Sequence, residues 1–198
     1  MRLITHPLLK LSLATITTVA VLTSLPSKVM AIGFTGDYAT SNWTLTNSNA
    51  DGDVDITNAG LNSIDLIGGN NGSTTPGTTD WTIAITPARA GTLIFTWSYG
   101  SLDSAGNDVA GYLYNGTFTQ LATTDGQLSS SPVTFTLNDG DTFGFRVETL
   151  TNDGGAGALS VSNFNVQPVP FEFEGSAGIL TIGAIWGINK WCKNRVKK

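Results

Sequence analysis

Between residues 32 and 168 the chain contains no cysteine, no histidine and no lysine. Without an imidazole base, this segment cannot build the Ser-His-Asp or Cys-His arrangements of nucleophilic catalysis. The missing thiolates and imidazoles exclude the usual zinc sites, and the missing lysine excludes Schiff-base chemistry and a phosphate-binding loop. No disulfide can form within the segment, so its stability must come from a hydrophobic core, for which about 137 residues suffice.

Positive charge is also scarce in this central segment. It holds thirteen acidic residues and two basic ones, Arg89 and Arg146, so its net charge is 2 − 13 = −11. The other eight basic residues of the chain lie within the first 31 residues or after residue 189. Because nucleic-acid binding requires basic contacts to phosphate, we expect no nucleic-acid partner. The two ends and the middle are therefore interpreted separately.

The first 31 residues have the three parts of a secretory signal peptide. Arg2 and Lys10 precede the apolar stretch 11–25, and Val29 and Ala31 provide the small residues of a cleavage site. We predict cleavage by signal peptidase after Ala31. The alternative is an uncleaved membrane anchor, which is less favoured because the apolar stretch is shorter than the roughly 20 residues of a spanning helix.

The C-terminal segment predicts a second membrane element. Residues 175–188 are uncharged and mostly apolar, and five basic residues follow between 190 and 198. The pattern predicts a transmembrane helix over 175–191 and a basic cytoplasmic tail over 192–198, with the preceding domain outside the cell. The helix would be about 25 Å long, so it is short for a hydrocarbon core of roughly 30 Å.

The linker 167–174 contains Val-Pro-Phe-Glu-Phe-Glu just before this helix. The order of motif, apolar segment and basic tail resembles the PEP-CTERM sorting signal, in the cyanobacterial variant where Pro-Phe-Glu replaces Pro-Glu-Pro. The matching residues are Pro170, Phe171 and Glu172. The resemblance implies an exosortase-type protease that cuts near the motif and passes the protein to the cell surface or extracellular matrix. A plain single-pass anchor is the alternative.

The segment 32–166 alternates apolar and polar residues with the period of half-buried strands, for example at Phe95, Trp97 and Tyr99. Asn115-Gly116 and Asp139-Gly140 each predict a tight hairpin turn, and a change of parity at Ser162–Asn163 predicts a β-bulge. About nine short strands with polar turns predict an all-β antiparallel sandwich.

Residues 90–165 also resemble a CUB-like or jelly-roll domain that is common in secreted PEP-CTERM proteins. The stretch from Gly91 to Leu121, the hairpin sequence Leu-Asn-Asp-Gly-Asp-Thr-Phe-Gly-Phe-Arg-Val and the final strand carry this similarity. It implies the same fold and a surface location, and it implies no substrate.

The densest group of carboxylates is Asp51, Asp53 and Asp55. Alternating acids present the oxygen ligands that Ca²⁺ prefers, with the spacing of the first three positions of an EF-hand loop. The glutamate that would complete such a loop is replaced by Asn62, and no flanking helices are indicated. One interpretation is a structural Ca²⁺ site on a sandwich loop. The interpretation we favour is a turn at Asp51-Gly52, with Asp53 and Asp55 facing solvent.

A second polar group consists of Asp103, Asn107 and Asp108, in the loop after a predicted strand. These side chains could bind Ca²⁺ or accept hydrogen bonds from sugar hydroxyls. Tyr112 and Tyr114 alternate with Leu113 on the next strand, and if Leu113 faces the core, both tyrosines face outward as a candidate glycan contact. Ordinary cross-strand packing of the two aromatic rings is the alternative that we favour.

Glycoside hydrolysis would need two carboxylates in a cleft. The predicted ectodomain has one glutamate, Glu148, which alternates with Val147 and is expected to point outward. We therefore expect a non-enzymatic, secreted, surface-sorted protein with a structural or adhesive role in an exopolysaccharide matrix. The alternative is a carbohydrate-binding module, with Ca²⁺ as the one cofactor that the sequence leaves open.

Overall fold

The computed structural model describes residues 31–168, which correspond to the predicted ectodomain. The predicted signal peptide up to residue 30, the sorting motif Pro170-Phe171-Glu172, the helix 175–191 and the tail 192–198 lie outside the described residues. Within 31–168, none of the helices has the length and hydropathy of a membrane span.

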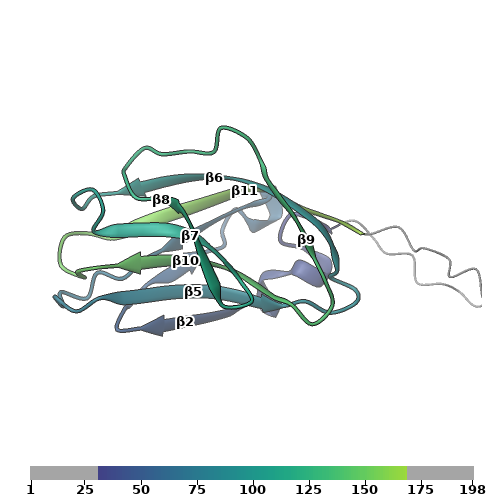
Figure 1. Ribbon diagram of the computed structural model, residues 1–198, viewed down its shortest axis with the longest axis horizontal. Helices are drawn as coiled ribbons and strands as arrows, with labels where there is room; N and C mark the ends of the chain where they lie inside the picture. Colours follow the sequence, from purple (N-terminus) through teal and green to yellow (C-terminus); the bar gives the residue numbers. More distant parts are fainter. Residues whose placement is uncertain (1–30, 169–198) are drawn as a thin grey trace, which may run out of the picture.

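The described chain forms a sandwich of two antiparallel sheets, as the sequence predicts (Figure 1). The first sheet has the order β3-β4-β11-β6-β9, with β1 also paired to β11. Its strands are β1 (Ala31–Ile32), β3 (Asp53–Asp55), β4 (Ser63–Ile67), β6 (Gly91–Ser101), β9 (Val133–Leu137) and β11 (Gly157–Pro168). The second sheet has the order β2-β5-β10-β7-β8. Its strands are β2 (Thr44–Ser48), β5 (Gly77–Ala84), β7 (Asp108–Tyr114), β8 (Thr117–Ala122) and β10 (Thr142–Thr149).

Alternating apolar residues from both sheets form one aromatic-rich core. Trp43 and Trp81 stack with ring centroids 4.2 Å apart, and Phe95 meets Phe145 edge to face at 5.3 Å. Offset and edge-to-face arrangements are the preferred geometries of aromatic pairs. Three short 3₁₀ helices, η1 (Gly36–Tyr38), η2 (Thr40–Asn42) and η3 (Ala59–Leu61), add to this core the buried side chains Tyr38 and Ala59.

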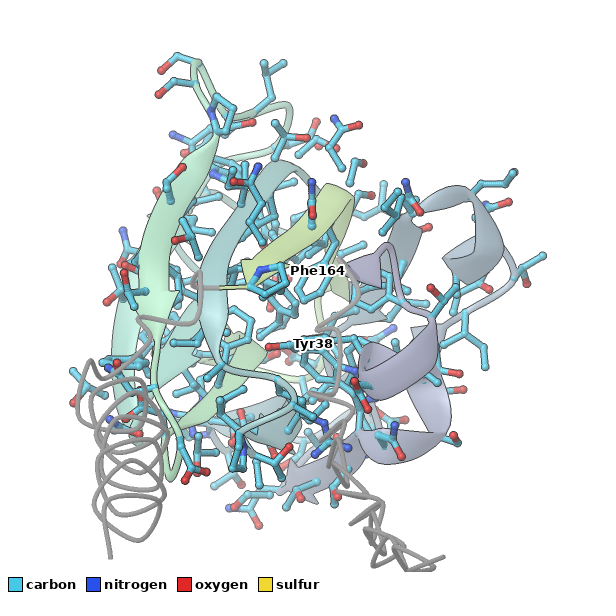
Figure 2. The ribbon with its side chains drawn as sticks, turned by 90° about the vertical axis from the view of Figure 1, so that its right-hand side faces the viewer. Tyr38 and Phe164 are labelled. Carbon is cyan, nitrogen blue, oxygen red and sulfur yellow. The ribbon has the colours of Figure 1, made fainter. Side chains whose placement is uncertain are left out.

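The predicted β-bulge in the last strand is confirmed. The pairing of β11 with β6 shifts register between Ser162 and Asn165, and Asn163 has a φ of +53°. Asparagine tolerates this left-handed conformation better than most residues. The extra residue turns Phe164 inward, where its ring centroid lies 5.4 Å from that of Tyr38 (Figure 2).

One of the two predicted hairpins is correct and the other is wrong. Asn115-Gly116 joins β7 to β8, with positive φ at both residues as a type I′ turn requires. Asp139-Gly140 also forms a turn, but it joins β9 of the first sheet to β10 of the second. The turn residues are the same in both cases because turn chemistry is local. The hydrophobic core determines which strand each of the two pairs with. Leu137 on β9 and Phe143 on β10 are both fully buried, and they enter the core from opposite sheets.

The two ends of the sandwich differ in what they carry. Pro168 at the end of β11 pairs with Gly91, and Gly157 at its start pairs with Ser101. Because β1 pairs with Asn165 and Val166, the described chain begins and ends at the same end, which we call the terminal end (Figure 1). We call the opposite end, with the loops 102–107 and 150–156, the distal end.

Candidate functional site

The sandwich has an open pocket of about 500 Å³ beside strands β7, β8 and β9. Strand β8 is the edge of the second sheet and β9 is the edge of the first. We call this the edge pocket, and its lining residues are Tyr112, Tyr114, Asn115, Thr117, Thr119, Phe135 and Thr136. The lining therefore combines three aromatic rings with hydroxyl and amide groups and has no charged side chain. Ligand sites for small polar molecules commonly have this composition.

Both tyrosines of the predicted glycan contact lie in this pocket, but they reach it from the inner face of the sheet. Tyr112 pairs with Phe145 and Tyr114 with Phe143, two fully buried core residues on the same face. Leu113 is on the outer face, opposite Gly144, where it is nevertheless 5 % exposed. The premise that Leu113 faces the core is therefore wrong. Sequence alternation shows that Leu113 and the tyrosines lie on opposite faces of the strand, but it does not show which face is inside.

Phe135, from the first sheet, lines the edge pocket and packs against both tyrosines of the second sheet. Its ring centroid lies 5.4 Å from that of Tyr112, with the planes 21° apart, and 5.6 Å from that of Tyr114, with the planes 70° apart. All three side chains are half-buried. Thr117 and Thr119 on β8 are exposed and sit opposite Tyr114 and Tyr112, so hydroxyl groups flank the rings. An apolar ring face beside hydroxyl groups matches the two kinds of surface on a sugar.

A hydrogen-bond network fixes one wall of the edge pocket. The Tyr114 hydroxyl donates to Asp141 Oδ2 at 2.8 Å, and Asn115 Nδ2 donates to Asp141 Oδ1 at 2.9 Å. The backbone N–H of Asn138 also donates to Asp141 Oδ2, at 2.7 Å. These donors lower the pKa of Asp141, with Asn115 as the largest cause, and Asp141 raises the pKa of Tyr114. The ring of Tyr114 is thus held in place before any ligand arrives.

The Asp141 network gives a pH-dependent contribution to stability. A carboxyl group whose pKa is lowered by folding stabilises the folded state above its unfolded pKa of 3.8, and this contribution is lost as the pH falls through the lower folded value. We expect Asp141→Asn to lower the urea midpoint at about pH 7, and the difference from the wild type to vanish toward about pH 2.

The matched control for this titration is Asp139→Asn, which changes a neighbouring exposed acid outside the network. We expect it to leave the midpoint unchanged over the same range. If the wild type keeps the same higher urea midpoint over Asp141→Asn at acidic pH, the ionised carboxylate is not the source of the difference.

The carboxylates of Asp51, Asp53 and Asp55 each accept a nearby backbone N–H. Their partners are Asn70, Val54 and Thr57 at 2.6, 2.7 and 2.8 Å, respectively. All three acids are exposed, and Val54 between the last two is half-buried. Within residues 31–168, no group of three or more Asp, Glu, His or Cys side chains has a metal-binding arrangement.

The second predicted group does come together, at the distal end. Ser101 Oγ donates to Asp108 Oδ2 at 2.9 Å and accepts the Asp103 N–H at 3.1 Å, and Asn107 Nδ2 donates to Asp103 Oδ1 at 3.1 Å. This group is separate from the edge pocket, because Asp108 begins β7 and Tyr114 ends it, about 20 Å apart at the rise of a strand. A cation at Asp103 and Asp108 would therefore not contact the sugar unit that stacks on Tyr114.

Glu148 lies on the outer face of the second sheet in an ion-pair network. Arg146 binds Asp80 through two hydrogen bonds of 2.6 and 2.7 Å and donates to Glu148 at 3.2 Å. The edge pocket is lined by no carboxylate. The pair of acids required for glycoside hydrolysis is therefore not formed there.

No family model and no curated protein matches the chain. Among solved structures, a carbohydrate-binding module from the β-sandwich superfamily aligns with a TM-score of 0.44 and 17 % identity, over 69 % of this chain and 61 % of that one. This chain thus spans about three fifths of that structure.

Two further matches are also to carbohydrate-binding modules. The family 11 module of the cellulase Lic26A-Cel5E of Clostridium thermocellum aligns with a TM-score of 0.37 and 11 % identity, over 63 % and 86 % of the two chains. TmCBM61, solved with β-1,4-galactotriose, aligns with a TM-score of 0.37 and 10 % identity, over 65 % and 89 %.

Proposed function

We propose that the sandwich binds a polysaccharide in the edge pocket without transforming it. The observation that carries this proposal is the meeting of Tyr112, Tyr114 and Phe135 in an open pocket whose remaining lining is hydroxyl and amide groups. Such a surface can stack on the apolar face of a sugar ring and exchange hydrogen bonds with its hydroxyls.

The ligand is a neutral polysaccharide. No side chain in the lining carries a charge, so the pocket offers no counter-ion for a uronic acid or a sulfated sugar. The whole segment 32–168 has a net charge of −11, which repels polyanions at longer range.

The setting of this binding is the cell surface. The signal-peptide pattern supports export by signal peptidase, and the PEP-CTERM-like end with Pro170, Phe171 and Glu172 supports sorting by an exosortase-type protease. A domain that binds matrix polysaccharide, anchored transiently or permanently by its C-terminal helix, would have an adhesive or structural role.

The binding proposal is tested by affinity electrophoresis of the full-length protein in gels containing neutral or anionic polysaccharides. The neutral set is β-glucan, xylan, mannan and galactan, and the anionic set is alginate and polygalacturonate. We expect retardation by at least one neutral polymer. Thr119→Arg, which puts a long charged side chain into the pocket, is expected to abolish it. Tyr112→Ala is expected to weaken binding about thirtyfold, as truncation of an aromatic anchor commonly costs about 2 kcal/mol.

Gln120→Arg is the matched control, because Gln120 is exposed on the same strand and points to the opposite face. It adds the same charge and should leave retardation unchanged. The proposal is wrong if no neutral polymer retards the folded wild type, or if both arginine variants lose binding equally.

A further inference from the structure

Among the buried side-chain oxygens at the distal end that have no hydrogen-bond partner, four belong to Asp108 and residues near it. They are Tyr99 Oη, Asp103 Oδ2, Asp108 Oδ1 and Thr149 Oγ1. Three of these residues are almost fully buried, because Tyr99 is 3 % exposed and Asp108 and Thr149 are each 1 % exposed. Buried polar atoms normally have partners, so such a concentration requires a physical explanation.

Protein donors satisfy only one oxygen of each carboxylate. Asp108 Oδ2 accepts from the Ser101 hydroxyl, and Asp103 Oδ1 accepts from Ser104 N–H and Asn107 Nδ2. The second oxygen of each group has no hydrogen bond of good geometry, although the Thr149 hydroxyl and the Gly157 N–H lie close enough to Asp108 to favour its ionised form. The two acids are linked through Ser101, whose hydroxyl bonds to both residues. One loop thus fixes two carboxylates and leaves an oxygen of each available.

Two neutral hydroxyls from different strands flank Asp108. Thr149 is its cross-strand partner on β10, and Tyr99 reaches it from β6 of the opposite sheet. A Cβ built on Gly157 would lie 2.5 Å from Tyr99 Oη and 2.9 Å from Asp108 Cβ, so both side chains crowd against the same point of backbone. Burial raises the pKa of Tyr99 to about 12, so its hydroxyl is neutral at physiological pH.

No basic side chain of the described segment balances this charge. Arg146 is bound to Asp80 and Glu148, and Arg89 donates to the carbonyl oxygens of Asp37 and Ala84. Asp108 is 1 % exposed, so its carboxylate lies in the interior without a positive side chain beside it. A buried charge is costly unless it is paired, and a cation from outside the described segment would supply the missing partner.

We propose that Asp103 and Asp108 bind a divalent cation of the Ca²⁺ type, with the hydroxyls of Tyr99 and Thr149 close to it directly or through water. All the proposed ligand atoms are oxygens, and the two carboxylates balance the charge of a divalent cation. The site has no nitrogen or sulfur ligand, which a transition metal would favour. Ca²⁺ accepts such mixed, irregular oxygen sets more readily than Mg²⁺ does. The cation would join β6 of the first sheet to β7 and β10 of the second and so brace the distal end. This site is independent of the edge pocket and of its ligand.

The test is Tb³⁺ luminescence and thermal unfolding of the full-length protein. We expect Tb³⁺ emission sensitised by the nearby phenol of Tyr99, displaced by Ca²⁺ at about millimolar concentration, as in other extracellular modules. Ca²⁺ at about a hundred times its Kd should raise Tm by roughly 5–10 °C, and Mg²⁺ by less. Asp103→Asn and Asp108→Asn should each remove the Ca²⁺-dependent shift, and Tyr99→Phe should lower the Tb³⁺ emission.

Asp51→Asn is the matched control, because Asp51 is an exposed acid of another loop whose carboxylate accepts the Asn70 N–H. It should retain the full Ca²⁺ response. If Asp108→Asn does not fold, the Ca²⁺ response of Asp103→Asn tests the proposal, because Asp103 is only partly buried. The proposal is overturned if Ca²⁺ and Mg²⁺ give equal shifts that survive Asp103→Asn, if Asp51→Asn removes the response instead, or if no cation binds. A wild type that gains stability only as the pH falls, without any cation response, would show that a proton serves in its place.

Discussion

Phe164→Ala is expected to lower the free energy of unfolding by about 3–5 kcal/mol, the range observed when a buried phenylalanine is truncated. Phe164 is 0 % exposed, and its ring stacks on Phe34 at 4.6 Å and meets Tyr38 at 5.4 Å and Trp43 at 6.0 Å. These neighbours come from the N-terminal segment, whereas Phe164 comes from the last strand. Alanine would leave a cavity where the N-terminal segment 34–43 packs on the sheets. Figure 2 shows one of these contacts, between Tyr38 and Phe164.

Urea unfolding followed by tryptophan fluorescence measures this loss. Leu102→Ala is the control, because Leu102 is 91 % exposed and its truncation should change the free energy by less than about 0.5 kcal/mol. A loss below about 1.5 kcal/mol for Phe164→Ala, with an unchanged m-value, would contradict the close packing around this ring.

Replacing Pro170, Phe171 and Glu172 together with alanine is expected to abolish C-terminal processing. If the proposed sorting occurs, protein recovered from the native cell surface has lost about 3 kDa from each end of the 20.8 kDa chain. This figure follows from the mean mass per residue. The motif variant should keep its C-terminal segment and lose only the N-terminal mass. Intact-mass spectrometry reports the processing of both termini in one measurement.

Processing at the motif should leave the sandwich intact, because the last paired residue of β11 is Pro168, opposite Gly91. Cleavage after Ala31 would remove one residue of β1 and leave Ile32 opposite Asn165. We therefore expect processed and unprocessed protein to have the same Tm within about 3 °C. Glu174→Ala, an acid outside the motif, should be processed normally. The sorting proposal fails if the motif variant is trimmed like the wild type, or if the wild type retains residues 192–198.

The sequence was sufficient for the class of fold and for several local features. Strand alternation has a period of two and is visible in any window of a few residues, so it predicted the sandwich. The turn at Asn115-Gly116 and the bulge at Ser162–Asn163 also depend on local backbone preferences, and both are present. The charge imbalance of the central segment is likewise a property of the sequence alone.

The candidate sites depended on partners that are distant in the sequence. The sequence does not assign Phe135 to the edge pocket, because a hairpin at Asp139-Gly140 would place β9 beside β10 in one sheet, whereas the two strands belong to different sheets. The group of Asp103, Asn107 and Asp108 was recognised, but Tyr99 and Thr149 were missed, since they reach it from other strands.

The sequence by itself therefore determined an acidic, disulfide-free β-sandwich between two segments that predict export and sorting. Only the tertiary structure decided which sheet each strand joins, and with it which side of β7 faces the interior. That choice belongs to the core as a whole, because burying Phe143 and Phe145 on β10 fixes the register of β7 and turns Tyr112 and Tyr114 inward. Alternation specifies that a strand has two faces, and the free energy of packing all strands together selects which face is inside.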